Sequence, residues 1–480
     1  MNTPILLLLL LVGYYGLIML TARIVGKRND NNTFFTGNHQ SPWYIVAIGM
    51  LGTSISGVSF ISVPGMVREN GFLYMQTVVG FFFGYILIAK VLLPLYYRLE
   101  SASIYEYLAK RFGNNAYKTG AGFFLLAKSL GAAAKAFVIV LMMQTLLLNA
   151  YGVPFAVTTV IFVFLIWLYT QRSGIKTLVW TDALQTIALL VSLIWLVVSF
   201  GNALHLDLGG MVNVIRESSY SHCVEWSDWH SKQHVVKQFF SGIFIALVMT
   251  GLDQDMIQKN RTISRLKNSQ KNMYWYGFGF IPLNLLFLSL GALMLIFAQQ
   301  HSIALPKSSD EILPMLVTQG FLNPAVILLF TLGILSTSFN SADSALTAMT
   351  TSFCIDIADK PTDERFRKWT HAGFALVLVV FILLFRQINR PSLIDVIYTL
   401  VSYTYGPLLG LFAFGLLTKR KPVDRLIPWI AAASPLVCFV LQYASRTWLG
   451  YSFGYELLMM NGLLTFSGLW LFSKNKSTWI

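Results

Sequence analysis

The sequence predicts an all-α polytopic membrane protein with about 13 transmembrane helices, and three observations lead to this fold class. Hydrophobic residues make up 55% of the 480 positions and charged residues only 12%, roughly half of what a soluble protein carries. Apolar stretches of the roughly 20 residues that cross a bilayer recur along the whole chain. These stretches are continuous rather than alternating with a period of two, which favours helices over a membrane β-barrel.

The predicted spans form a single transmembrane domain over residues 1–480. The first apolar stretch lacks the basic start and the small-residue cleavage site of a secretion signal, so we expect it to be retained as a helix. The expected spans are 4–22, 43–66, 72–97, 117–148, 155–170, 176–200, 236–256, 273–298, 323–353, 370–387, 393–418, 425–445 and 454–473.

Lysine and arginine residues are distributed unevenly among the segments that connect these spans. Roughly three times as many fall on one side of the membrane as on the other, and one rich segment holds Lys259, Arg261 and Arg265. The bias predicts that the N-terminus lies outside and the C-terminus in the cytoplasm, and we expect the membrane to be a bacterial inner (plasma) membrane. It also accounts for the net charge of +14 without a nucleic-acid partner. The three cysteines have no disulfide or metal spacing.

The longest outer segment, residues 201–235, contains four histidines beside two tryptophans. A zinc site is one interpretation, and a solvated loop with tryptophans at the membrane interface is the interpretation that we favour. These residues are His205, His222, His230 and His234, with Trp226 and Trp229.

Helix-breaking residues occur in two spans that stand five apart. The second span contains Gly52 and Gly57, and the seventh contains Gly251 followed by Asp253. An odd number of spans per set inverts the second set relative to the first, and interrupted helices at matching positions of inverted repeats point to the midplane site of a transporter. The alternative is that these small residues only let helices pack closely.

This repeat divides the chain into five parts. They are an extra N-terminal helix with its linker at 1–42, a first repeat at 43–200, the outer loop at 201–235, a second inverted repeat at 236–418, and extra C-terminal helices at 419–480.

Five motifs follow one another along the chain. They are Phe35-x-Gly37 with Ser41-Pro42-Trp43-Tyr44; Ser103-Ile104-Tyr105-Glu106-Tyr107-Leu108 running to Arg111-Phe112-Gly113; Gly174 to Gln185, which includes Trp180-Thr181-Asp182; Asp253-Gln254-x-x-x-Gln258; and Ser341-Ala342-Asp343-Ser344 closing with Asp356-Ile357. Together they resemble the sodium:solute symporter family, whose members carry sugars, proline, iodide, pantothenate, monocarboxylates or sialic acids. The resemblance implies a LeuT-type five-plus-five inverted-repeat fold with one extra N-terminal and two extra C-terminal helices. Lys259 replaces the arginine of the family motif.

A dehydrated sodium ion needs hard oxygen ligands, which carbonyls at a helix break and hydroxyls supply. By resemblance, the main sodium site comprises Gly52, Ile55, Thr337, Asn340 and Ser341. The residues of the ninth span share one helical face. Asn340 departs from the serine usual in the family, and the alternative role of this hydroxyl face is back-bonding to the helix backbone.

Asp182 lies within a span, where a carboxylate is costly and a functional role is the default. The resemblance implies that it lines a second sodium site or an ion exit route, with Ser341 as its partner. We expect the carboxylate of Asp343, one turn from Asn340, to contribute to the electrostatic field at the same site. The alternatives are that Asp182 forms a structural ion pair and that Asp343 is a helix-interior residue paired with a lysine.

Lys128 and Lys135 stand seven residues apart on one face of the fourth span, where one could hold an anionic solute or both could balance the charge of Asp182 or Asp343. The residues that we expect to line the solute site are Ser54, Ser56, Ser59, Gln76, Lys128, Lys135, Phe244 and Met249. Packing is the alternative role for the serines and the aromatic residue.

These features favour a secondary active symporter over an enzyme. We expect it to couple inward sodium flux to uptake of a small organic solute, with a sugar acid such as sialic acid preferred to a neutral sugar, an amino acid or a monocarboxylate. The expected partners are sodium, the solute and the lipid bilayer, and the expected functional unit is a monomer. A transporter-like solute sensor is the alternative of another class.

Overall fold

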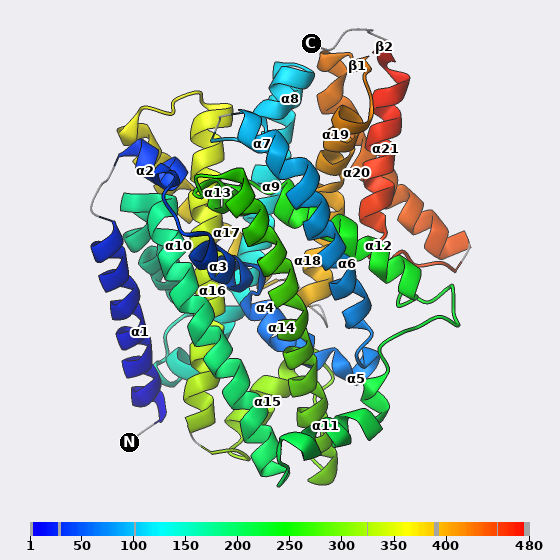
Figure 1. Ribbon diagram of the computed structural model, residues 1–480. Coiled ribbons are helices and arrows are strands. Elements are labelled where there is room, and N and C mark those ends of the chain that lie inside the picture. Colours follow the sequence, from blue (N-terminus) through cyan, green and yellow to red (C-terminus); the bar gives the residue numbers. More distant parts are fainter. Residues whose placement is uncertain are drawn as a thin grey trace.

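The computed structural model describes residues 3–26, 30–99, 102–323, 325–387, 393–448 and 450–474. Within these ranges the chain is almost entirely helical, and its two ends lie at opposite ends of the helix bundle (Figure 1). Two short strands, β1 (Lys421–Pro422) and β2 (Ser473–Lys474), pair antiparallel beside the described C-terminal end, with Lys421 opposite Lys474.

The helices of the first half begin with α1 and end with the long α10. They are α1 (Thr3–Val25), α2 (Asn31–Thr36), η1 (Gly37–His39), α3 (Trp43–Ser54), α4 (Gly57–Gly65), α5 (Val67–Asn70), α6 (Tyr74–Leu87), η2 (Ile88–Leu92), α7 (Leu93–Leu99), α8 (Glu106–Arg111), α9 (Asn114–Met143), η3 (Gln144–Leu148), η4 (Asn149–Tyr151) and α10 (Phe155–Ala203).

The helices of the second half begin in the outer loop. They are α11 (Leu208–Glu217), η5 (Ser219–Ser221), α12 (Val235–Ala246), η6 (Leu247–Gly251), α13 (Gln254–Arg261), α14 (Leu266–Gln300), η7 (Ser309–Glu311), α15 (Ile312–Thr318), α16 (Ala325–Ser352), η8 (Phe353–Ile357), α17 (Glu364–Phe385), α18 (Leu393–Thr404), α19 (Gly406–Leu417), η9 (Asp424–Leu426), α20 (Ile427–Trp448) and α21 (Leu457–Leu471).

The expected spans all have helical counterparts among the described residues. Eight helices are long and apolar enough to cross a membrane, three bent pairs add a span each, and two shorter apolar helices cover Phe155–Gln171 and Leu457–Leu471. The fifth and sixth spans are joined in α10, where Gly174 has φ of +48° and breaks the helix between them. A side chain at this position would strike Phe34, so glycine suits both the backbone angle and the packing.

Both predicted helix breaks are present. The axes of α3 and of the helical segment Gly57–Asn70 differ by 62°, and those of Val235–Gly251 and α13 by 63°. Ile55 ends α3 in an extended conformation, and the Ser56 side chain accepts from the Ser59 backbone N–H (3.4 Å) to begin α4. Small residues at the first break therefore coincide with a change of chain direction.

Two features of the second repeat correct the sequence-based expectations. The seventh span does not stop at residue 256, because α13 continues to Arg261 and buries Lys259, which we had placed in an inner loop. The eleventh span, expected as one stretch over 393–418, consists of two helices, since α18 and α19 meet at 46° and Pro407 lies in the first turn of α19.

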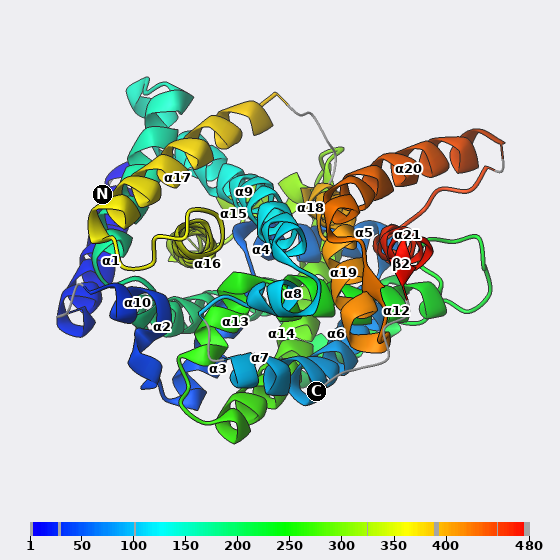
Figure 2. The same ribbon diagram turned by 90° about the horizontal axis from the view of Figure 1, so that it is seen from above.

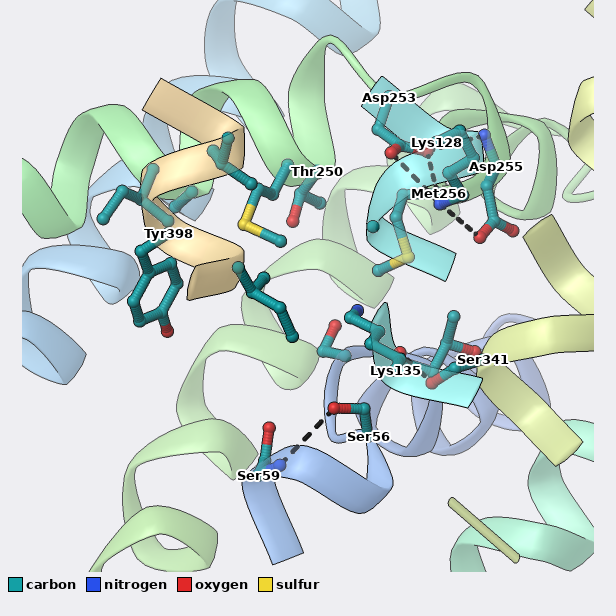
Figure 3. Close-up of a pocket in the computed structure, with 18 of the residues that line it drawn as sticks. Ser56, Ser59, Lys128, Lys135, Thr250, Asp253, Asp255, Met256, Ser341 and Tyr398 are labelled. Atoms are coloured by element: carbon teal, nitrogen blue, oxygen red, sulfur yellow. Dashed lines mark hydrogen bonds and ion pairs between the residues drawn. The ribbon is translucent and has the colours of Figure 1, made fainter. Parts of the chain in front are cut away.

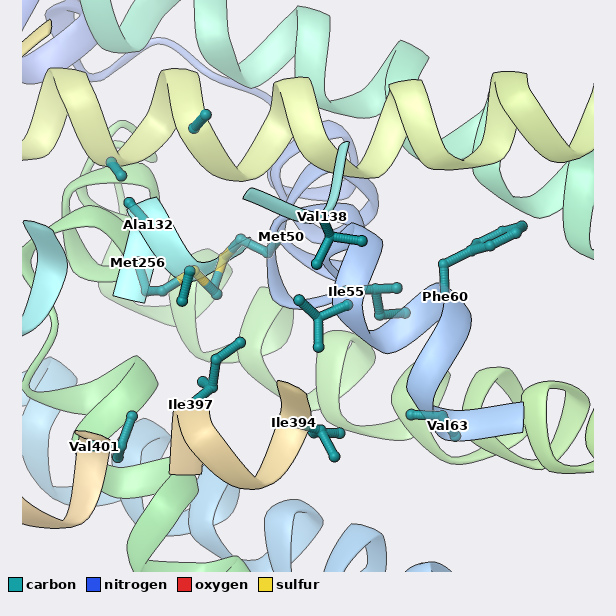
Figure 4. Packing of buried hydrophobic residues seen from close by; sticks show 14 of the residues in the cluster. Met50, Ile55, Phe60, Val63, Ala132, Val138, Met256, Ile394, Ile397 and Val401 are labelled. Atoms are coloured by element: carbon teal, nitrogen blue, oxygen red, sulfur yellow. The ribbon is translucent and has the colours of Figure 1, made fainter. Parts of the chain in front are cut away.

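Helix α16 is enclosed by α9, α10 and α17, and α1 and α20 lie at the edge of the bundle (Figure 2). Every residue of α16 from Gly333 to Ser352 is buried, whereas many apolar side chains of α1 and α20 are exposed, as expected for helices that contact lipid. Buried apolar residues from both broken pairs, α9 and α18 pack around the breaks (Figure 4), among them Met50, Ile55, Val138, Met256 and Ile397. This packing holds the two breaks against the same part of the core.

Candidate functional site

A cavity lies between the two helix breaks, α9 and α18. Its polar lining comes from separate elements that converge on it (Figure 3). These residues are Thr53, Ser54, Ser56 and Ser59 at the first break, Tyr85 on α6, Lys128 and Lys135 on α9, Thr250, Asp253 and Asp255 at the second break, Tyr276 on α14, Ser341 on α16, Tyr398 on α18 and Tyr405 where α18 meets α19. The cavity therefore offers hydroxyls and charges of both signs to a small polar ligand.

The first break packs directly against α16. The Ser341 hydroxyl lies 3.5 Å from the carbonyl oxygen of Thr53. A Cβ built on Gly52 would lie 2.9 Å from Nδ2 of Asn340, and one built on Gly57 would lie 3.7 Å from Oγ1 of Thr337. Glycine at these two positions thus permits the close approach that brings backbone oxygens next to side chains of α16.

The α16 residues expected to bind sodium use their side chains in different ways. Oγ1 of Thr337 donates to backbone carbonyls of its own helix (2.9 Å to Ile334), which leaves its oxygen lone pairs available. Oδ1 of Asn340 instead accepts from Oγ1 of Thr53 at 2.6 Å, and its Nδ2 donates to the backbone carbonyl of Asp182 at 3.3 Å. The Asn340 oxygen is therefore already bonded to the first broken helix.

Asp182 does not pair with Ser341 as expected. Its Oδ2 atom lies 2.7 Å from Nζ of Lys259, and both side chains are fully buried. The same ammonium group donates to Oγ1 of Thr53 (2.6 Å) and to the hydroxyl of Ser344 (2.7 Å). The position that we expected for a second sodium ion is thus occupied by a lysine of the chain itself.

Asp343 also has a partner other than the expected ones. It accepts a hydrogen bond from the hydroxyl of Tyr169 at 2.6 Å and another from the backbone N–H of Ser344 at 2.5 Å. The structure therefore gives Asp343 a neutral partner on α10 instead of a lysine.

The two lysines of α9 both line the cavity, but their environments differ. Nζ of Lys128 lies 3.1 Å from Asp253 and 2.8 Å from Asp255, as drawn in Figure 3. Lys135 forms no ion pair or hydrogen bond with any described residue, and Figure 3 draws no interaction for it. One ammonium group is neutralised, and the other faces the cavity without a counter-ion from the described part of the chain.

The other residues expected to line the solute site divide into two groups. Ser54, Ser56, Ser59 and Met249 line the cavity, and Ser54 shares a 2.5 Å hydrogen bond with the hydroxyl of Tyr276. The structure does not match the expectation for two others. The amide of Gln76 bonds to the outer loop, donating to the Gln233 carbonyl (2.9 Å) and accepting from the Glu225 N–H (3.1 Å), and Phe244 packs in the core outside the cavity lining.

The outer-loop histidines do not gather into a metal site. The ring of His234 packs against those of Trp226 and Trp229, and the exposed His222 lies near Glu225. No group of three or more histidine, cysteine, aspartate or glutamate residues suited to a metal ion occurs in the described part of the chain.

Several residues in the cavity lining or buried beside it were not identified from the sequence. Tyr276 and Tyr398 gave no signal because aromatic residues are frequent in all spans, at 14% of the chain. For Lys259 a signal was present, since it follows Asp255 by four residues and thus lies on the same helical face.

Comparison with known proteins places the chain among transporters. A model of the sodium:solute symporter family matches residues 34–445. The chain is 24% identical to the sodium/sialic acid symporter NanT of Aliivibrio fischeri, over 95% of this chain and 92% of that protein. It is 23% identical to the sodium-coupled monocarboxylate transporter 1 of Mus musculus, over 92% of this chain and 72% of that protein.

Among solved structures, the substrate-bound outward-open state of a Na+-coupled sialic acid symporter is similar, with a TM-score of 0.83 at 16% identity and with 98% of each chain covered. At this identity the likeness concerns the fold alone. It confirms the LeuT-type fold that the motifs implied.

Proposed function

The chain belongs to the sodium:solute symporter family, and we propose that the solute it carries with sodium is a small organic anion of the sugar-acid class. Family membership makes the chain a multi-pass membrane transporter rather than an enzyme, with sodium as a cotransported ion. The nature of the solute and the residues that bind it are the proposal.

The observation that carries this proposal is the environment of Lys135. An ammonium group at membrane depth is costly unless it is paired, and the described residues give Lys135 no partner. The other cation of the cavity, Lys128, is neutralised by two carboxylates. We assign Lys135 as the residue that binds the solute carboxylate, because a charge-assisted hydrogen bond would satisfy both groups.

The hydroxyls of the cavity favour a polyhydroxylated acid over a short monocarboxylate. Ser54, Ser56 and Ser59 line the first break, and Tyr276 and Thr250 face the same cavity. A hydroxyl both donates and accepts, so each of these groups can pair with a hydroxyl of a sugar. The relatives named for sialic acid and for monocarboxylates support a carboxylate as the shared feature.

We propose that sodium binds where the first break meets α16. The carbonyls of Gly52 and Ile55 with the hydroxyls of Thr337 and Ser341 are hard oxygen ligands from two helices, and Asn340 holds Thr53 beside them. Sodium bound there would order the stretch that carries the cavity serines. Solute and sodium would then increase each other's affinity by the same factor.

Transport would follow when the repeats rock about this site. A tenfold sodium gradient supplies about 1.4 kcal/mol per ion, enough to sustain a tenfold solute gradient. We retain as a proposal the orientation with the N-terminus outside and the C-terminus in the cytoplasm. The described ends lie at opposite faces of the bundle, which agrees with an odd number of spans (Figure 1), and the lysine and arginine bias supports the direction. A monomer in a bacterial plasma membrane also stays a proposal.

The test is uptake into proteoliposomes of four probes, N-acetylneuraminic acid, lactate, galactose and proline, each with a sodium or a choline gradient. We expect sodium-driven accumulation of the sugar acid, loss of it in Lys135→Gln, and retention in Lys135→Arg. Lys90→Gln is the matched control, because Lys90 is exposed on η2. Accumulation of galactose or proline instead, or full sugar-acid uptake by Lys135→Gln, would contradict the proposal.

A further inference from the structure

The ammonium group of Lys259 has the surroundings of a bound cation. Three oxygens lie 2.6–2.7 Å from Nζ, and each comes from a different helix: Thr53 of α3, Asp182 of α10 and Ser344 of α16. These distances are those of strong charge-assisted hydrogen bonds. Lys259 itself is carried by a fourth helix, α13, so one group ties four helices together.

The oxygens around Lys259 also contact one another. Oδ2 of Asp182 lies 3.3 Å from Oγ1 of Thr53 and 3.4 Å from the hydroxyl of Ser344, so carboxylate and hydroxyl oxygens surround one point. Hard oxygens of this kind are also what a sodium ion requires. Asp182, Lys259 and Ser344 are buried, Thr53 borders the cavity, and the ammonium group of Lys259 supplies the positive charge that balances the Asp182 carboxylate.

Two paths connect this cluster to the rest of the site. Thr53 accepts from Lys259 and donates to Oδ1 of Asn340, beside the proposed sodium position. Asp255 lies between Lys259 (3.5 Å) and Lys128 (2.8 Å), which lines the cavity. A cation at the Lys259 position is therefore linked by direct contacts to the proposed sodium position, through Thr53, and to the solute cavity, through Asp255.

We propose that Lys259 is a tethered cation that takes the place of a second sodium ion, so that each transport cycle uses one sodium only. This inference rests on the proposed sodium position between the first break and α16. One consequence is that one sodium moving with one monovalent anion transfers no net charge, and the membrane potential then does not drive uptake. Removal of the lysine side chain leaves the Asp182 carboxylate and two hydroxyls open to a free cation.

The test counts bound sodium in the purified full-length protein with 22Na+ as the only probe, without solute, against choline. We expect one saturable sodium per wild-type protein and two per Lys259→Ala protein. Lys259→Arg keeps a cation in place and should bind one. The double variant Lys259→Ala with Asp182→Asn should return to one, because the second ion loses its carboxylate.

Each outcome decides the inference. Two sodium ions per wild-type protein would overturn it while leaving the proposed sodium position intact, and none would overturn that position together with it. A folded Lys259→Ala protein that binds only one ion would also overturn it. If the alanine variant does not fold, a count of two sodium ions in the wild-type or the Lys259→Arg protein still overturns the inference. Because no solute is added, failure of the sugar-acid proposal leaves these counts unchanged.

Discussion

Substitution of Gly52 by alanine perturbs the contact on which the proposed sodium position depends. A Cβ at this position would lie 2.1 Å from Oγ1 of Thr186 and 2.9 Å from Nδ2 of Asn340. Thr186 cannot rotate away without cost, because its hydroxyl donates to the backbone carbonyl of Asp182 at 2.6 Å. Either that bond breaks or α3 moves away from α10 and α16.

The expected loss of stability follows from two costs, the broken hydrogen bond of Thr186 and the extra methyl group in the packed core. Loss of the hydroxyl bond is worth about 1 kcal/mol, and forcing an extra methyl group into a packed core costs about 1–3 kcal/mol. If α3 moves, the carbonyl oxygens at its end, which are the proposed sodium ligands, move with it. The sodium-free protein can relieve the clash by moving α3, so a cost of about 1–3 kcal/mol arises only when sodium binding returns α3 to its place, and the sodium affinity falls roughly 5- to 150-fold.

The assay is thermal unfolding of the detergent-solubilised protein across a sodium titration, with choline keeping the ionic strength constant. A ligand that binds only the folded state raises stability in proportion to the logarithm of its concentration above Kd, so a weaker site shifts the midpoint to higher sodium. Gly122→Ala is the matched control, since Gly122 lies on α9 and a Cβ built on it would have no described atom within 4 Å. A Gly52→Ala protein with the wild-type sodium midpoint would refute the reasoning.

Two further substitutions separate structural from solute-binding roles. Lys128→Met should lower the unfolding temperature, because it leaves Asp253 and Asp255 without the ammonium that bridges them; the loss of one partner from a buried pair costs about 3–5 kcal/mol, and an unchanged melting curve would contradict this role. Tyr276→Phe removes the hydroxyl that shares a 2.5 Å bond with Ser54, which should weaken binding of N-acetylneuraminic acid about fivefold, or about 1 kcal/mol. Calorimetric titration checks this, and equal loss of sodium affinity would point to a general structural defect.

Much of the fold could be predicted because its signals are local. Small residues around Gly52 and Gly57 indicate a break, and apolar length indicates each span. The break beside Gly406-Pro407 also has a signal in the sequence, because proline is favoured in the first turn of a helix, and the single span predicted over residues 393–418 does not use it.

The partners of the buried charges could not be predicted in the same way. The charge bias assigned Lys259 to a loop, because a lysine near a span end usually lies in water. Its burial depends on carboxylate and hydroxyl groups from α3, α10 and α16, which are distant in sequence. Gln76 was misassigned for a related reason, since its partners belong to the outer loop, which folds back onto α6.

The central claim is that sodium binds between the first helix break and the hydroxyl face of α16. The most direct measurement is 22Na+ binding to the purified wild-type protein and to a double variant, Thr337→Val with Ser341→Ala, which removes both proposed hydroxyl ligands. We predict saturable binding to the wild type that potassium and choline do not displace, and loss of that binding in a double variant that unfolds at the wild-type temperature in choline. Sodium binding with unchanged affinity in the double variant would contradict the account.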